Sequence, residues 1–190
     1  MKFSPARILQ KGFTLIELLV VIGILGILAA ALVATIDPFE QLKKADDSKI
    51  KNIAVEFQTA NVRYYTTHGS FPWSDANSSN ANCTAKGAGA FNLLLGAAGM
   101  IDCLGSANIN SSLIGEGELK AAFTSNLNDL NRIYTNWDPS DATNMTVCFS
   151  PKSKSQKSAP DTKFDKNGAT PIVGCPASTA PDDKCYWCTK

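Results

Sequence analysis

The chain has 190 residues, and its 18 basic and 17 acidic side chains give a formal net charge of +1. This length suits one globular domain with an additional anchor. The near-neutral charge excludes an overall basic field of the kind that attracts nucleic acid. His68 is the one histidine, which excludes a multi-histidine metal site. Because no Walker loop, glycine-rich phosphate motif or nucleophile–base arrangement is present, we expect no catalytic residues, no bound metal and no cofactor.

The stretch from Phe13 to Ile36 is almost wholly apolar and holds one ionisable residue, Glu17. At 1.5 Å per residue, about twenty of these residues would cross the ~30 Å hydrocarbon core of a bilayer. Residues 13–36 are therefore predicted to be a transmembrane helix. A carboxylate at this depth costs about 2.5–3.5 kcal/mol, so it needs a partner. A cut between Gly12 and Phe13 would create one, because the new amino group lies one helical turn from Glu17.

Residues 11–18, KGFTLIEL, resemble the class III signal of type IV pilins and the related pseudopilins without a gap. In that family a membrane prepilin peptidase cuts after the glycine and methylates the new N-terminal phenylalanine. The glutamate then neutralises the terminal amine of a neighbouring subunit during filament assembly. The resemblance implies a cleaved leader at residues 1–12, cleavage after Gly12, N-methylation of Phe13 and an assembly role for Glu17. Its implied partners are identical or related pilin subunits, the peptidase and, before assembly, membrane lipid.

The basic residues of the leader set the expected orientation. Lys2, Arg7 and Lys11 precede the apolar stretch and should stay cytoplasmic by the positive-inside rule. We therefore expect a single-pass protein of the cytoplasmic membrane with its N-terminus inside and its head outside, later part of an extracellular filament at the cell surface.

Beyond the apolar stretch, residues 37–67 are predicted to be the amphipathic outer half of the same helix. Pro38 lacks an N–H and clashes with the carbonyl of Ala34, so a kink or short break is expected there. Residues 43–47 are polar and favour a solvated or subunit-facing segment. Gly69 and Pro72 should end the helix. The apolar face at helical spacing comprises Ile50, Ile53, Ala54, Phe57, Ala60, Asn61 and Tyr64.

The end of this helix also resembles the family. Residues 64–72, YYTTHGSFP, are similar to the tyrosine-rich helix end and the glycine-aromatic-proline turn of pilins and major pseudopilins. On physical grounds these aromatic side chains favour a hydrophobic plug over a binding site. His68 is expected to be a solvated residue at the helix end.

The remaining residues, 68–190, are predicted to be an extracytoplasmic globular head. Residues 74–90 are rich in small and polar residues and indicate an exposed loop. Short helices are expected at residues 90–95 and 118–130. Strands are expected at residues 144–150, 172–175 and 185–188, with a hairpin turn at Asn167-Gly168.

All six cysteines lie beyond the apolar stretch, and an even number outside the cytoplasm indicates three disulfides with fifteen possible connectivities. If Cys185 and Cys188 lie on a strand, their Cα atoms are about 10 Å apart, beyond the ~7 Å that a disulfide spans. They should then bond to other cysteines, leaving Cys83 and Cys103 as a local pair. Redox or zinc chemistry at this C-x-x-C pair is the less favoured alternative. The candidates are Cys83, Cys103, Cys148, Cys175, Cys185 and Cys188.

Two further motifs have ordinary interpretations. Residues 161–168, DTKFDKNG, loosely resemble a calcium loop but lack its alternating acidic pattern, so a turn is favoured. The lysines between residues 152 and 166 make nucleic-acid contact conceivable but unsupported, because Phe164 is the one aromatic residue among them. A solvated loop is favoured there.

Together these features predict an α+β fold, with a long N-terminal transmembrane and amphipathic helix packed on a small antiparallel sheet in a disulfide-tied head. The predicted function is a structural subunit of a type IV pilus-like filament, serving adhesion, motility or DNA uptake. An alternative is a pseudopilin of a type II secretion or competence machine, and a more distant one is a membrane-anchored redox or hydrolytic enzyme. The resemblance covers roughly residues 11–72, so the fold expected for the rest of the head rests on analogy.

Overall fold

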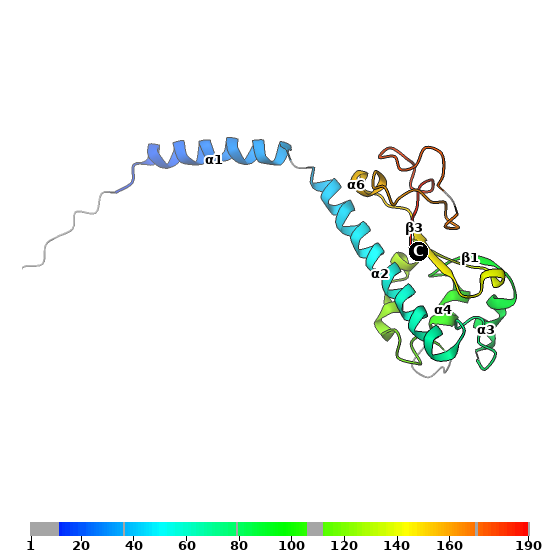
Figure 1. The fold of residues 1–190 in the computed structure, drawn as a ribbon. Coiled ribbons are helices and arrows are strands. Elements are labelled where there is room, and N and C mark those ends of the chain that lie inside the picture. Colours follow the sequence, from blue (N-terminus) through cyan, green and yellow to red (C-terminus); the bar gives the residue numbers. More distant parts are fainter. Residues whose placement is uncertain (1–11, 36, 79, 106–111, 170, 190) are drawn as a thin grey trace, which may run out of the picture. The chain divides into compact units, whose positions relative to one another are not determined.

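The computed structural model describes residues 12–35, 37–78, 80–105, 112–169 and 171–189. The chain divides into two compact units, Met1–Phe39 and Glu40–Lys190, and we call the second unit the head (Figure 1). Residues 1–11 of the predicted leader, with Lys2, Arg7 and Lys11, lie outside the described residues.

The first unit contains helix α1, which runs from Leu15 to Thr35 and has 21 residues. At 1.5 Å per residue this helix is about 31 Å long, which matches the hydrocarbon core of a bilayer. Its Leu15–Val33 segment is long and apolar enough to cross a membrane, and none of it is buried inside the structure.

Helix α2, Pro38–His68, begins where the sequence predicts an interruption. Asp37 accepts a hydrogen bond from the N–H of Phe39 at 3.1 Å, as an N-cap residue does. Pro38 is the first residue of α2, a position where proline loses no hydrogen bond. At the other end Gly69 has φ +73° and donates its N–H to the carbonyl of Tyr65, which closes α2 as predicted.

The described residues of the head form an antiparallel sheet of four strands in the order β1-β2-β3-β4. The strands are β1 (Phe91–Leu94), β2 (Ile133–Trp137), β3 (Met145–Phe149) and β4 (Trp187–Cys188). This sheet and the long helices confirm the predicted α+β architecture.

One face of the sheet packs against α2 and forms the main core. Ile133, Thr135 and Trp137 of β2 are buried on this face, while Tyr134 and Asn136 between them are partly exposed on the other. Helix α2 contributes the buried face that its spacing predicts, with Ile53 partly buried beside it. The buried side chains of α2 are Asp47, Ile50, Ala54, Phe57, Ala60, Asn61 and Tyr64.

The other face of the sheet is partly covered by the C-terminal segment. Phe164 and Tyr186 lie over this face in a second, smaller core cluster. The rings of Tyr134 and Tyr186 meet edge to face, with centroids 5.9 Å apart. The main and smaller clusters thus place apolar groups on both sides of the sheet.

Short helical turns connect these elements. They are α3 (Ala81–Thr84), η1 (Ala85–Ala88), α4 (Ala98–Leu104), η2 (Ala121–Ser125), α5 (Leu127–Leu130), η3 (Pro139–Asp141) and α6 (Lys154–Lys157).

Several expected elements in the head are wrong. Residues 90–95 do not form a helix: Phe91–Leu94 are strand β1, whose backbone pairs with β2. The helix expected at 118–130 is divided into η2 and α5 by Asn126, whose backbone is not helical (φ −119°, ψ 79°). Residues 172–175 form a turn instead of a strand, and Asn167-Gly168 lies in a turn that joins no two named strands.

Candidate functional site

Helix α1 begins with a capping box formed by Thr14 and Glu17. The N–H of Glu17 donates to Thr14 Oγ1 at 3.3 Å. Glu17 Oε2 in turn accepts two hydrogen bonds from Thr14, one from its N–H at 2.9 Å and one from its hydroxyl at 2.8 Å. This reciprocal arrangement satisfies two N–H groups that an uncapped helix would leave without partners. The structure therefore gives Glu17 a local role at the start of α1, beside the assembly role that its family resemblance implies.

The residues on either side of the predicted cut are accessible. A Cβ placed on Gly12 would meet nothing within 4 Å among the described atoms. Phe13 is 83% exposed. The fold itself therefore sets no requirement for glycine at position 12, and any such requirement would come from the enzyme that recognises this bond.

The surface of α1 has no partner among the residues of the first unit that the structure describes. Apolar side chains around the whole helix are exposed, among them Ile16, Val20 and Leu28. A Cβ on Gly23 or Gly26 would also meet nothing within 4 Å. An apolar helix without an internal partner is buried in lipid or against other chains.

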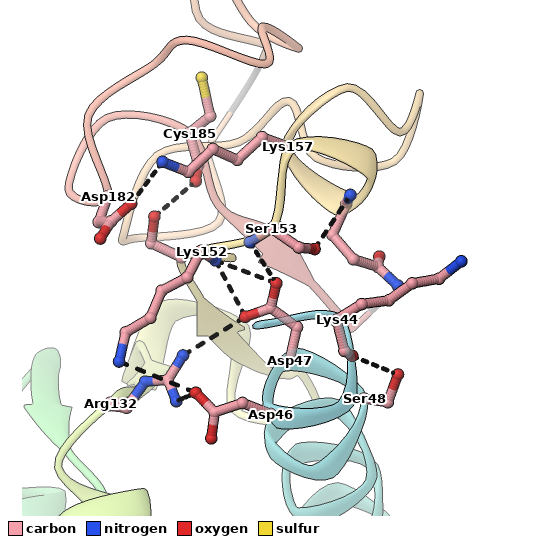
Figure 2. Close-up of polar contacts among 12 residues, drawn as sticks. Lys44, Asp46, Asp47, Ser48, Arg132, Lys152, Ser153, Lys157, Asp182 and Cys185 are labelled. Carbon is pink, nitrogen blue, oxygen red and sulfur yellow. Dashed lines mark hydrogen bonds and ion pairs between the residues drawn. The ribbon is translucent and has the colours of Figure 1, made fainter. Parts of the chain in front are cut away.

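In the head, the most buried acidic group is Asp47 of α2, which is fully buried (Figure 2). Its carboxylate accepts the backbone N–H of Lys152 at 2.9 and 3.0 Å and that of Ser153 at 2.7 Å. A guanidinium nitrogen of Arg132 lies 3.4 Å away. The expectation that residues 43–47 are solvated is wrong for Asp47, because these partners replace the water that its carboxylate loses.

Two neighbouring acidic residues of α2 strengthen the same attachment. Asp46 receives a hydrogen bond from Arg132 at 2.5 Å, with Lys152 Nζ 3.8 Å away. Glu40 accepts the backbone N–H of Lys154, the first residue of α6. One face of α2 thus fixes the chain directly after β3, which ties the sheet to the helix at a second place besides the apolar core.

Each of the six cysteines is in a disulfide: Cys83–Cys103, Cys148–Cys188 and Cys175–Cys185. Cys148 and Cys188 are directly opposite one another on β3 and β4, with Cα atoms 4.1 Å apart. Cys185 and Cys188 do not bond to one another, as predicted, although the strand expected at residues 185–188 is limited to β4, Trp187–Cys188. Among the residues that the structure describes, no group of three or more His, Cys, Asp or Glu side chains could hold a metal ion.

The aromatic residues at the end of α2 form a plug in the head. Tyr64 is buried and donates its hydroxyl to Asp75 at 2.8 Å. Phe71 is buried and packs on Trp73, with ring centroids 5.1 Å apart. His68 is exposed and stacks on Tyr64, as a residue at a helix end can. This arrangement agrees with a packing role for these side chains.

The segment from residue 152 to residue 168 is more ordered than a solvated loop. The Lys157 ammonium, largely buried, pairs with Asp182 and donates to the carbonyl of Ala180 at 2.8 Å. Asp165 accepts the backbone N–H groups of Asn167 and Ala169, both at 2.8 Å. The acidic segment that resembles a calcium loop therefore contains a turn closed by its own side chain.

Comparison with known proteins points to the N-terminal segment. Residues 7–33 match the family model described as the prokaryotic N-terminal methylation motif. The chain is 38% identical over 76 residues to a fimbrial protein of Neisseria meningitidis serogroup A, covering 40% of this chain and 44% of that protein. It is 42% identical over 64 residues to the type IV major pilin protein PilE1 of Neisseria gonorrhoeae, covering 34% of this chain and 38% of the pilin.

The matched segments span less than half the length of these relatives. No solved structure gives a significant match to the chain. The names of the relatives describe fimbrial and pilin proteins, which are structural proteins and not enzymes. Its N-terminal segment therefore carries the methylation motif and is similar to that of type IV pilins.

Proposed function

We propose that this chain is a structural subunit of a type IV pilus-like filament, assembled from a membrane-anchored precursor. The observation that carries the proposal is the segment from Gly12 to Glu17, where an accessible predicted cut site directly precedes a capped helix that is apolar except for Glu17 and the terminal Thr35. In this proposal the peptidase removes residues 1–12 and Phe13 becomes the methylated N-terminus. The membrane releases the mature subunit into a filament whose interior is built from α1 helices.

The charge chemistry of assembly centres on Glu17 and the new amino group. After cleavage, the α-amino group of Phe13 is positively charged and close in sequence to Glu17. The Glu17 carboxylate accepts hydrogen bonds from the N–H and the hydroxyl of Thr14. When apolar helices pack side by side, the amine of a second subunit can reach the same carboxylate. Desolvation offsets much of the attraction in such an ion pair. Its main effect is to fix axial register, because any other offset leaves both charges buried without partners.

The proposed location follows from the same elements. Helix α1 spans the cytoplasmic membrane before assembly, with the leader inside and the head outside. The disulfides of the head are compatible with an oxidising compartment. After assembly the head faces the outside of an extracellular filament.

A pilus subunit is the form of this proposal that the relatives favour. The two relatives described above are named as a fimbrial protein and a major pilin, not as components of a secretion or competence machine. Their names therefore support a surface filament over a pseudopilus.

The test separates the assembly role of Glu17 from its capping role. Glu17→Gln keeps a side chain that can complete the capping box but removes the charge. Thr14→Val removes the capping hydroxyl and keeps the carboxylate. Cells carrying each variant, or Glu17→Ala, are sheared, and the chain is measured in the membrane and filament fractions.

We expect Glu17→Gln and Glu17→Ala to be cleaved and inserted in the membrane but nearly absent from filaments. Thr14→Val should lose about 1 kcal/mol of helix stability and still assemble. Wild-type amounts of filament from Glu17→Gln would contradict the ion-pair mechanism. Filament loss in Thr14→Val alone would assign Glu17 to capping only.

A further inference from the structure

The first two turns of α2 expose apolar side chains that the head leaves uncovered. Phe39 is 73% exposed and Leu42 is 66% exposed. Beyond α1, every other Phe, Tyr and Trp that the structure describes is at least partly buried, so Phe39 carries the one exposed aromatic ring of this region. Phe39 and Leu42 are three residues apart on α2, which places them on one side of the helix. They form a small apolar surface at the N-terminal end of α2.

This surface continues the buried side of α2. Ile50 and Phe57 follow Phe39 on the same side, about three and five turns further along the helix. Both are fully buried in the main core of the head. The buried side of α2 begins at Asp47, so the described part of the head does not reach the first two turns. Helix α2 therefore begins with an apolar side that its own head does not cover.

The lysines beside this surface also lack partners in the head. Further along α2, Lys49 and Lys51 each pair with an aspartate of the head. Lys43 and Lys44 are exposed, and neither forms an ion pair with a described residue. Figure 2 shows the Lys44 side chain extending away from the contacts of the buried Asp47. Two ammonium groups are thus available beside the apolar surface.

The acidic groups of the same region are bound to the protein instead. Asp37 caps α2 by accepting the N–H of Phe39. Glu40 accepts the backbone N–H of Lys154. Asp46 pairs with an arginine that follows α5. The carboxylates at this end of α2 are therefore engaged within the chain, whereas the ammonium groups remain available for an anionic partner.

The chain keeps these side chains near the end of α1. Phe39 and Leu42 follow Thr35, the last residue of α1, after only a few residues. Helix α1 is about as long as the hydrocarbon core of a bilayer is thick, so the residues directly after it emerge into the headgroup layer. Because the connecting segment is short, the first two turns of α2 stay within reach of this layer.

The headgroup layer suits both kinds of exposed group. Aromatic and aliphatic side chains at this depth bury their apolar surface at the edge of the hydrocarbon. A lysine near the membrane surface is attracted to anionic lipids by about 1 kcal/mol. An apolar surface flanked by lysines is the pattern of helix segments that lie in this layer.

We propose that, before assembly, the first two turns of α2 lie in the outer headgroup layer of the membrane. Phe39 and Leu42 enter the edge of the hydrocarbon, and Lys43 and Lys44 bind the phosphates of anionic phospholipids. The inference rests on the membrane-spanning role of α1 in the proposed function and adds a second membrane attachment, made by α2. A second copy of the chain is the main competing occupant of this surface.

The test uses the full chain in vesicles of phosphatidylcholine with phosphatidylglycerol, and in neutral vesicles of phosphatidylcholine alone. An environment-sensitive fluorescent amino acid replaces Val20, Leu42 or Val62, one position at a time. Val62 is the matched control, because it is exposed on the same helix but lies about 30 Å further along it. Val20 reports whether α1 is inserted. Quenching by nitroxide groups, placed in the lipid headgroup or deep in the acyl chain, measures the depth of each label.

We expect acyl-chain nitroxides to quench the label at position 20. Headgroup nitroxides should quench the label at position 42 about fivefold more than the label at position 62. Replacing Lys43 and Lys44 together by glutamine should lower the quenching at position 42 about twofold in the anionic vesicles and leave it unchanged in the neutral ones. The same replacement of Lys120 and Lys184, which are exposed and lie outside α2, is the control for lost charge and should have no effect.

The outcomes separate this inference from the proposed function. Equal quenching at positions 42 and 62, with position 20 quenched, would overturn the headgroup contact and leave α1 in the membrane. An unquenched label at position 20 would overturn the membrane span, and the inference with it. A blue-shifted label at position 42 that headgroup nitroxides do not quench would identify a second copy as the occupant and overturn the proposal. Quenching at position 42 that the paired lysine variant leaves unchanged in anionic vesicles would refute the role of the lysines.

Discussion

Helix α1 and the head differ in where their apolar side chains find partners. The apolar residues of α1 are exposed, while those of the head pack between α2 and a sheet that three disulfides and a buried carboxylate reinforce. The head therefore carries its own stabilising interactions, and α1 depends on a bilayer or on other subunits. Under the proposed function, we therefore expect changes near α1 to affect processing and assembly, and changes in the head to affect folding.

The largest expected effect is a complete block of cleavage that leaves the head folded. Gly12→Val should block cleavage, because the family peptidase tolerates little bulk before the cut. The head should fold normally, because a Cβ at Gly12 contacts nothing within 4 Å. Immunoblots of membrane fractions should show full-length precursor alone. Gly26→Val is the control, since its added side chain is equally free of contacts but lies away from the cut. A processed Gly12→Val chain would refute the cleavage assignment.

The disulfide that closes the longer loop should stabilise the head more, because the loop entropy grows with the logarithm of loop length. Replacing Cys148 and Cys188 by alanine opens a loop of 40 residues and should cost about 4 kcal/mol. The same change at Cys175 and Cys185 opens a loop of 10 residues and should cost about 2.5–3 kcal/mol. Denaturant unfolding of the two double variants measures both. Equal losses, or a larger loss for the shorter loop, would contradict this order.

Asp47 should stabilise the head more than its neighbour on α2. Asp47→Ala leaves the buried N–H groups of Lys152 and Ser153 without an acceptor and should cost about 3 kcal/mol. Asp46→Ala removes a partly exposed ion pair with Arg132 and should cost less than about 1 kcal/mol. The free energy of unfolding, measured in denaturant, tests the difference. Similar losses for both variants would show that the buried hydrogen bonds add little.

A smaller expected effect is a loss of stability at alkaline pH, caused by Tyr186 on the outer face of the sheet. Burial, with the nearby charges of Tyr134, Asp183 and Asp165, raises the pKa of Tyr186 to about 12. Because the unfolded chain releases this proton near its ordinary pKa of 10.0, stability is full below pH 10 and falls as pH rises towards 12. Unfolding curves at several alkaline pH values should show this loss in wild type and a shallower one in Tyr186→Phe. Identical pH dependence in the two proteins would exclude Tyr186 as its source.

The sequence correctly predicts the buried face of α2 but wrongly predicts a solvated Asp47. Both outcomes have one physical reason. The spacing of Ile50, Phe57 and Tyr64 is local, so a helix face can be read directly from it. The partners of Asp47 are backbone groups of Lys152 and Ser153, more than a hundred residues away. From the sequence alone, a charged residue without partners nearby in the chain is interpreted as solvated. The partners of Asp47 come close to it only in the folded chain.

The strands show the same limit. Residues 91–94, FNLL, do not alternate clearly, and they form strand β1 because they pair with β2. Strand β2 was not predicted, because buried Thr135 hides the alternation between Ile133 and Trp137. In the candidate site, the roles of Gly12, Phe13 and Glu17 are predictions from the family resemblance, whereas the capping role of Thr14 was not predicted. The local pattern Thr-x-x-Glu before an apolar run would have indicated it.

The most direct test of the central claim is the mass of the mature chain purified from cells. We predict an intact mass equal to residues 13–190 with one added methyl group and three disulfides, and fragmentation that places the methyl group on the nitrogen of Phe13. A mature chain that retains residues 1–12, or one cut at another bond, would contradict the account.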